Sequence, residues 1–153
     1  MNGHRFACRV YFEDTDAGGV VYHAGYLRFA ERARTEALRD LGVPHSALVD
    51  EFGLIFVVRR VKLDYLRPAR LDESLEVSTR VLAIGASRIA LAQTIQRAGE
   101  TLVEAEVLLA CVRRTDGKPA RIPPRWRDAL ERDAAAVSMR ETAVVGPNRE
   151  LLG

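Results

Sequence analysis

The longest helical pattern in the chain spans residues 23–41 and reads HAGYLRFAERARTEALRDL. Its apolar side chains recur at the three- and four-residue spacing of one helix face: Leu27, Ala30, Ala37, Leu38 and Leu41. Several of them are small, which allows the helix to lie close to a sheet. The pattern stops at Gly42 and Pro44, residue types that end helices. We therefore predict a helix of about 19 residues, roughly 28 Å long.

On both sides of this helix the chain changes to segments that are typical of strands, either rich in β-branched and aromatic residues or alternating in polarity. One segment precedes the helix and four follow it: residues 5–12, 57–65, 74–84, 87–97 and 101–113. The turns at 85–86 and 98–100 are short, and turns of this length join antiparallel strands. The sequence therefore predicts one antiparallel sheet.

The dimensions of these elements predict how they pack. Five strands about 4.8 Å apart make a sheet roughly 24 Å wide, which one helix of roughly 28 Å can cover on one face. The predicted fold class is α+β, a curled antiparallel sheet of about five strands around one long central helix. A short helix over 44–52 and a C-terminal helix that begins at Pro123–Pro124 and is shorter than the central helix complete the elements. We predict a single domain over residues 1–137 and a loose tail over 138–153.

The face of the sheet away from the helix is apolar in part. Its apolar residues are Leu82, Leu108, Ala110 and Val112. Side chains of this kind are normally kept from water. They predict either a contact with another subunit or burial under the C-terminal helix, and the sequence leaves both open.

The composition excludes several classes of protein. The 153 residues are 48% hydrophobic and 29% charged with a net charge of +2, which is too balanced for a dedicated nucleic-acid binder. No apolar run approaches the roughly 20 residues that cross a bilayer, and the N-terminus does not resemble a secretory signal, so we expect a cytoplasmic protein. Cys8 and Cys111 do not have metal-ligand spacing, and we expect no metal.

Chemically, the informative stretch is YFEDTDAGGVVYHAGYL, residues 11–27, where Asp16 lies in a glycine-rich loop seven residues before His23 at the helix start. A helix N-terminus offers unpaired N–H groups and a partial positive charge, which can polarise a carbonyl oxygen. A carboxylate beside it can attack the carbonyl carbon or activate a water. The residues alone favour a simpler explanation, in which Asp16 caps the loop and His23 is an exposed residue at the helix start.

Two stretches resemble a known family. These are YFEDTDAGGVVYHAGYLRFAERAR and IFVVRRVKLDYLRPARLDESLEV, which resemble hotdog-fold acyl-CoA thioesterases of the 4-hydroxybenzoyl-CoA thioesterase type, most closely the tol-pal system-associated members. The resemblance covers about residues 5–120. It implies a hotdog fold that hydrolyses an acyl-CoA thioester to a free acid and CoA, with neither metal nor redox cofactor.

The resemblance also implies roles for individual residues. Asp16 corresponds to the catalytic carboxylate, and His23 to the position whose backbone N–H polarises the thioester carbonyl. The predicted substrate-binding residues are Tyr22, Arg59 and Arg88, with basic side chains meeting the CoA phosphates. The family implies a homodimer or homotetramer with each active site at a dimer interface.

The arginines also have readings that do not depend on the family. Strand alternation places Arg59 on the apolar face with Val57 and Val61, where a charge needs a partner. That partner is either a phosphate or a carboxylate of the helix, Glu31 or Glu36. Arg88 is explained equally well by a solvated charge at a strand end. We interpret Glu31 as structural, because Asp16 already supplies the acid.

Other functions are compatible with parts of the pattern. A hotdog dehydratase or hydratase would act on hydroxyacyl thioesters, and a catalytically silent protein would bind an acyl carrier or an envelope complex. Within the thioesterase interpretation, the sequence leaves open an acyl carrier protein in place of CoA, the acyl group, and whether Asp16 acts as nucleophile or general base.

Overall fold

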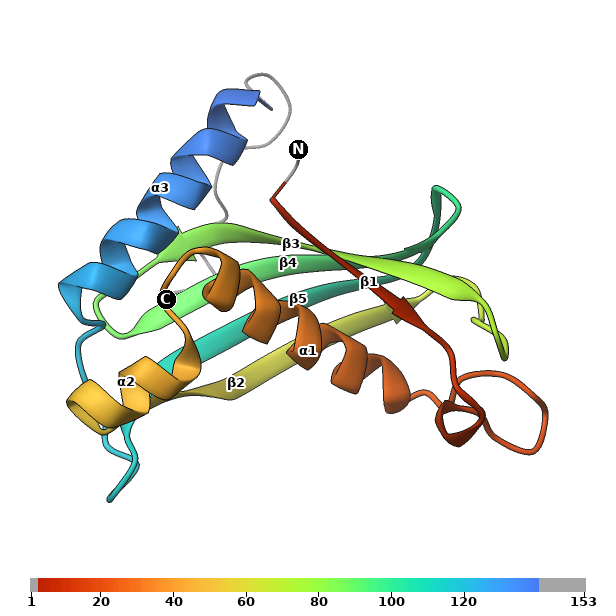
Figure 1. Cartoon of the computed structure of the whole chain (residues 1–153), viewed down its shortest axis with the longest axis horizontal. Coiled ribbons are helices and arrows are strands. Elements are labelled where there is room, and N and C mark those ends of the chain that lie inside the picture. Colours follow the sequence, from red (N-terminus) through yellow and green to blue (C-terminus); the bar gives the residue numbers. More distant parts are fainter. Residues whose placement is uncertain (1–2, 141–153) are drawn as a thin grey trace.

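The computed structural model describes residues 3–140 and contains one five-stranded sheet in the order β1-β3-β4-β5-β2, in which every neighbouring pair is antiparallel. The strands are β1 His4–Arg9, β2 Leu54–Tyr65, β3 Ser74–Ile84, β4 Arg88–Arg97 and β5 Glu100–Arg113. The helices are α1 Gly25–Asp40, α2 His45–Phe52 and α3 Pro124–Arg140, with a 3-10 turn at Phe12–Asp14. α1 lies along the sheet, with the loop before it at one end of the molecule and α2 and α3 at the other (Figure 1).

The predicted elements are all present, and the boundaries differ by at most three residues. The α+β class and the single antiparallel sheet of five strands are confirmed. One difference concerns α3, which has 17 residues against 16 in α1 and is therefore not the shorter helix. The predicted tail begins at residue 138, but α3 continues to Arg140, so the tail prediction is wrong for residues 138–140. The rest of the predicted tail, residues 141–153, lies outside the described residues.

The stripe of α1 that faces the sheet differs from the predicted one. Its buried residues are Tyr26, Phe29, Ala30, Ala33 and Leu38, and the first four follow the i, i+3, i+4, i+7 spacing of a helix face. Leu27 is next to Tyr26 in sequence and therefore about 100° around the helix, and it is 39% exposed. The aromatic residues, rather than Leu27, anchor the first turns of α1 in the core.

A buried polar network ties the middle of α1 to the centre of the sheet. The side-chain amide of Gln93 on β4 is 1% exposed and donates to the Ala30 carbonyl at 3.0 Å and to the Thr79 hydroxyl at 2.9 Å. Its oxygen accepts from the Arg34 guanidinium at 3.0 Å. Because buried polar groups are costly when unpaired, this network favours one position of α1 along the sheet.

We expect Gln93→Met to lower the free energy of unfolding by about 2 kcal/mol, because Arg34 and Thr79 lose their partner while the volume is largely kept. Urea denaturation followed by circular dichroism measures this. Gln96→Met, on the same strand but outside the network, is the matched control and should cost less than about 0.5 kcal/mol. Equal losses in the two variants would show that the network contributes nothing specific.

Three of the four apolar residues predicted for the other sheet face are buried within the single chain, and Leu82 is half-buried. Leu108, Ala110 and Val112 are only 4–6% exposed, so a second subunit is not needed to cover them. Trp126 and its neighbours on α3 pack with Leu109 and Cys111, the alternate residues of β5. The expectation that a single chain leaves these three residues exposed is therefore wrong.

Both cysteines are free thiols, and burial raises the pKa of Cys8 and of Cys111 to about 11. They pack as small apolar side chains, as their sequence context indicates. Among the helices of residues 3–140, none is both long and apolar enough to cross a membrane.

Candidate active site

The loop that carries Asp16 is a tight hairpin. Thr15 and Val21 form an antiparallel bridge, and inside it the Asp16 N–H donates to the Val20 carbonyl at 2.9 Å. Gly19 closes the turn with a φ of 77°, a left-handed conformation that favours glycine. The sequence Asp-Ala-Gly-Gly therefore makes a fixed turn rather than a flexible linker.

The Asp16 side chain is exposed, and one of its oxygens is used locally. Oδ1 accepts the Gly18 N–H at 2.8 Å, the turn-capping role that the sequence left open as an alternative. No described residue donates to Oδ2. The carboxylate is thus held in orientation by one oxygen while the other is available to a substrate or a water.

The start of α1 is connected directly to this loop. The Tyr22 N–H donates to the Asp14 carbonyl at 3.1 Å, and Asp14, a buried residue, accepts the Tyr11 N–H on Oδ2 at 2.8 Å. The Tyr22 carbonyl accepts the Gly25 N–H at 2.7 Å. The N-cap residue Ala24 has no side-chain cap. Among the described residues, no acceptor meets the backbone N–H of His23 or of Ala24, so two donors remain at the positive end of the helix dipole.

Two tyrosines that the sequence did not single out hold this helix start. The Tyr65 hydroxyl, at the end of β2, donates to the His23 carbonyl at 2.9 Å. The Tyr26 hydroxyl accepts the Ala69 N–H at 2.9 Å, and the Tyr26 and Tyr65 rings are 5.7 Å apart. The Ala69 carbonyl in turn accepts the Val21 N–H at 2.9 Å. Segment 66–73 therefore braces both the loop and the helix start.

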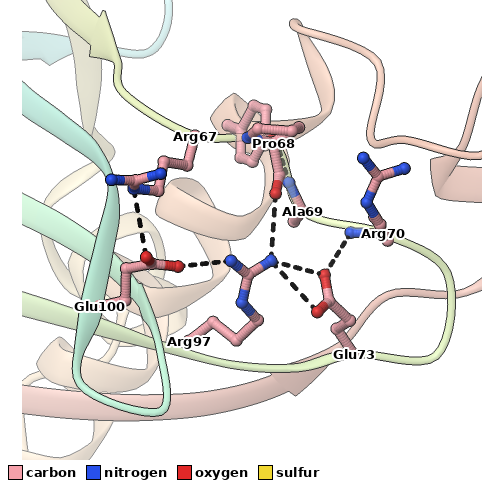
Figure 2. Close-up of polar contacts among 8 residues, drawn as sticks. Arg67, Pro68, Ala69, Arg70, Glu73, Arg97 and Glu100 are labelled. Atoms are coloured by element: carbon pink, nitrogen blue, oxygen red, sulfur yellow. Dashed lines mark hydrogen bonds and ion pairs between the residues drawn. The ribbon is translucent and has the colours of Figure 1, made fainter.

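An ionic cluster fixes segment 66–73 on the sheet (Figure 2). The Arg97 guanidinium on β4 bonds both oxygens of Glu73, at 2.9 and 3.1 Å, and the Pro68 carbonyl at 3.2 Å. Its other nitrogen pairs with Glu100, which also binds Arg67 at 3.1 Å. These carboxylates raise the pKa of Arg97. The contacts that hold the candidate site in place thus form a continuous series from the start of α1, through segment 66–73, to the β4–β5 turn.

The expectation that Arg59 lies on the apolar face is wrong. The register between β2 and β5 shifts between Val58 and Arg60, so a bulge at Arg59 interrupts the alternation. Val57 pairs with Ala110 and therefore lies on the opposite face from Val61, which pairs with Val107. Arg59 is exposed, and no described carboxylate, including those of the helix, forms an ion pair with it.

The structure brings together only some of the predicted site residues. Tyr22 is exposed, and its ring lies 4.3 Å from that of His23. Arg59 is six residues before Tyr65 on the same strand, which is about 20 Å. Arg88 begins β4 opposite Ala110, which also pairs with Val57. Within one chain, both arginines are therefore at the other end of the sheet from His23.

The second half of α1 borders a cavity of about 610 Å³. Most of its walls are apolar, from β2, β3, β4 and β5, and its polar side chains include Arg34 and His45. Burial lowers the pKa of His45, and the nearby Arg34 lowers it further. None of the predicted site residues lines this cavity.

Comparison with known proteins identifies the family of this chain. The model of the thioesterase-like superfamily matches residues 10–130. The chain is 48% identical over 120 residues to the acyl-CoA thioester hydrolase YbgC of Escherichia coli O6:H1, covering 78% of this chain and 89% of that protein. It is 47% identical over 129 residues to the acyl-CoA thioesterase YbgC of Haemophilus influenzae, covering 84% and 95%.

Solved structures show the same architecture. A probable thioesterase from Bartonella henselae superposes with a TM-score of 0.76 at 41% identity, covering 78% of this chain and 98% of the other. This likeness confirms the hotdog fold that the sequence resemblance implied. With the family model matching well over half of its residues, the chain belongs to the thioesterase-like superfamily.

Proposed function

We propose that this protein hydrolyses acyl-CoA thioesters to a free carboxylic acid and CoA. The observation that carries the proposal is that an oriented, exposed Asp16 carboxylate lies in the loop that leads into the start of α1, where two N–H donors have no acceptor among the described residues. The YbgC relatives, which are named as acyl-CoA thioesterases, support the substrate class. The proposal includes a cytoplasmic location, where CoA thioesters are made and used.

In the proposed reaction the thioester carbonyl oxygen accepts hydrogen bonds from the start of α1. As an oxygen nucleophile adds to the carbonyl carbon, negative charge develops on this oxygen, and the helix dipole stabilises it. Asp16 either attacks the carbon itself or removes a proton from the attacking water. If Asp16 removes a proton from water, that proton passes to the sulfur as the C–S bond breaks, and CoA leaves as the thiol. If Asp16 attacks, C–S cleavage gives an acyl–Asp16 anhydride and a CoA thiolate that takes a proton from solvent, and water then hydrolyses the anhydride. Water supplies the oxygen of the product acid.

Release of free thiol from a panel of acyl-CoA substrates, followed with a thiol reagent, tests the proposal. Thiol release that depends on Asp16 supports hydrolysis. A dehydratase would change the acyl group without releasing thiol, and a silent binding protein would bind acyl-CoA without turnover. A parallel assay with acylated carrier protein shows which carrier the enzyme prefers.

The proposed assembly is a homodimer or homotetramer joined along β2, with each active site at a dimer interface. β2 has 12 residues and is the last strand of the sheet. No described strand pairs with its outer edge, so the backbone groups there can pair with a second copy. Val58 and Tyr65 on this strand are exposed by 46% and 48%. Tyr22 and His23 are exposed beside Tyr65, which supports a site completed by another subunit.

Arg59 and Arg88 remain proposed CoA contacts, and Tyr22 a proposed acyl contact.

Light scattering at micromolar concentration is expected to report a dimer or a tetramer. Val58→Lys places a charge on the exposed strand edge and should shift the particle toward the monomer, because such charges oppose edge pairing. Ala135→Lys, an exposed position on α3, is the control and should keep the assembly. An active, monodisperse monomer in the unmodified protein contradicts the proposed interface.

A further inference from the structure

Two consecutive peptide groups at the start of α1 are anchored by their carbonyls. The Tyr22 carbonyl accepts the Gly25 N–H at 2.7 Å, and the His23 carbonyl accepts the Tyr65 hydroxyl at 2.9 Å. A trans peptide is planar, and its N–H points opposite to its C=O; the described chain has no cis peptide. The hydrogen bond from Tyr65 therefore fixes the direction of the next N–H, that of Ala24, which points away from the phenol.

Tyr65 is itself well placed to hold that peptide. It is the last residue of β2 and pairs in register with Val103 of β5. Its ring packs 5.7 Å from that of Tyr26, whose hydroxyl is held by the Ala69 N–H. The sheet and segment 66–73 thus determine where the Tyr65 hydroxyl lies, although the side chain is half exposed.

The same hydrogen bond also strengthens the donor. An O–H group bonded to a peptide carbonyl polarises the whole amide, so that its N–H becomes a better donor. The Ala24 N–H lies at the positive end of the α1 dipole and has no acceptor among the described residues. Such a donor is of most use to an oxygen that gains negative charge during a reaction.

We propose that Tyr65 is a positioning residue that orients the His23–Ala24 peptide, so that the Ala24 N–H acts with the His23 N–H as a second donor to the thioester carbonyl oxygen. This inference rests on the proposed thioesterase function and deepens it. It assigns Ala24, through its backbone alone, to the site, and it gives Tyr65 a role that requires no contact with the substrate.

The first test is Tyr65→Phe, which removes only the hydroxyl. Loss of one oxyanion donor costs about 10²–10³-fold in kcat, and loosening one costs less, so we expect kcat to fall about 10-fold. KM should stay within twofold, because the donor matters most as charge develops. Tyr11→Phe, which removes another exposed phenol hydroxyl, is the matched control and should keep kcat. An unchanged kcat in Tyr65→Phe, or a fall confined to KM, overturns the proposal.

A double-mutant cycle shows whether Tyr65 acts through Ala24. Ala24→Pro removes the Ala24 N–H, and the φ of −77° at this residue suits proline. In the Ala24→Pro background, Tyr65→Phe should cost no further kcat, because the donor that it orients is absent. A 10-fold fall in both backgrounds overturns the proposal. If circular dichroism shows Ala24→Pro unfolded, the kcat and KM of Tyr65→Phe decide alone.

These outcomes separate this inference from the proposed function. Absence of thiol release in the unmodified protein contradicts the thioesterase function itself. Turnover that is abolished by Asp16→Asn but unaffected by Tyr65→Phe leaves the function standing and rejects only the positioning role.

Discussion

Replacing Asp16 with asparagine is expected to lower kcat for acyl-CoA hydrolysis by about 10³-fold while KM stays within a few-fold. A general acid–base group contributes about 10²–10⁴-fold, and a neutral amide can neither attack the thioester nor accept the proton of water. KM should persist because the substrate is bound mainly by other groups. Initial rates of thiol release over a range of acyl-CoA concentrations measure both constants.

The structure makes asparagine an informative replacement. Its side-chain oxygen can still accept the Gly18 N–H, as Oδ1 of Asp16 does at 2.8 Å, so the turn should survive. Asp16→Ala removes the charge and the turn contact together. Similar losses in the two variants assign the effect to the charge, and a much larger loss in Asp16→Ala adds a contribution from loop geometry. An Asn variant that keeps most of its turnover rejects the proposed mechanism.

The sheet was predictable because its signal is local. In β3, β4 and β5 one set of alternate residues, which includes Val77, Leu91 and Val107, is buried, since a strand with one face in the core must alternate in polarity. The bulge in β2 was not predictable in this way. One inserted residue at Arg59 reverses the face of every residue before it, and nothing in VVRRVKL marks where the insertion lies.

The candidate site was predictable only as far as it is contiguous in sequence. Asp16 and His23 lie within eight residues of each other, and the glycines between them indicate the tight turn that the structure contains. Tyr65 is 42 residues beyond His23. Its contact depends on the length of β2, on its register with β5 and on the path of segment 66–73, which are tertiary properties that no local pattern encodes.

Substitutions at His23 should separate the imidazole from the backbone donor. His23→Ala keeps the N–H and the exposed helix start, so a small or moderate fall in kcat is expected. His23→Pro deletes the N–H, and removal of one oxyanion donor costs about 10²–10³-fold in kcat. The expected order of kcat is therefore the unmodified protein, then the Ala variant, then the Pro variant far below.

The Pro variant is interpretable because of where His23 lies. The residue precedes α1, which begins at Gly25, and no described carbonyl accepts its N–H, so proline removes no hydrogen bond from the fold. Circular dichroism must confirm this before the rate is read. If the Ala variant falls as far as Asp16→Asn, the imidazole itself takes part in the reaction. If the folded Pro variant keeps a kcat near that of the unmodified protein, the His23 N–H does not polarise the thioester carbonyl. In that case Ala24→Pro identifies the donor: loss of turnover in this variant makes the Ala24 N–H the principal one.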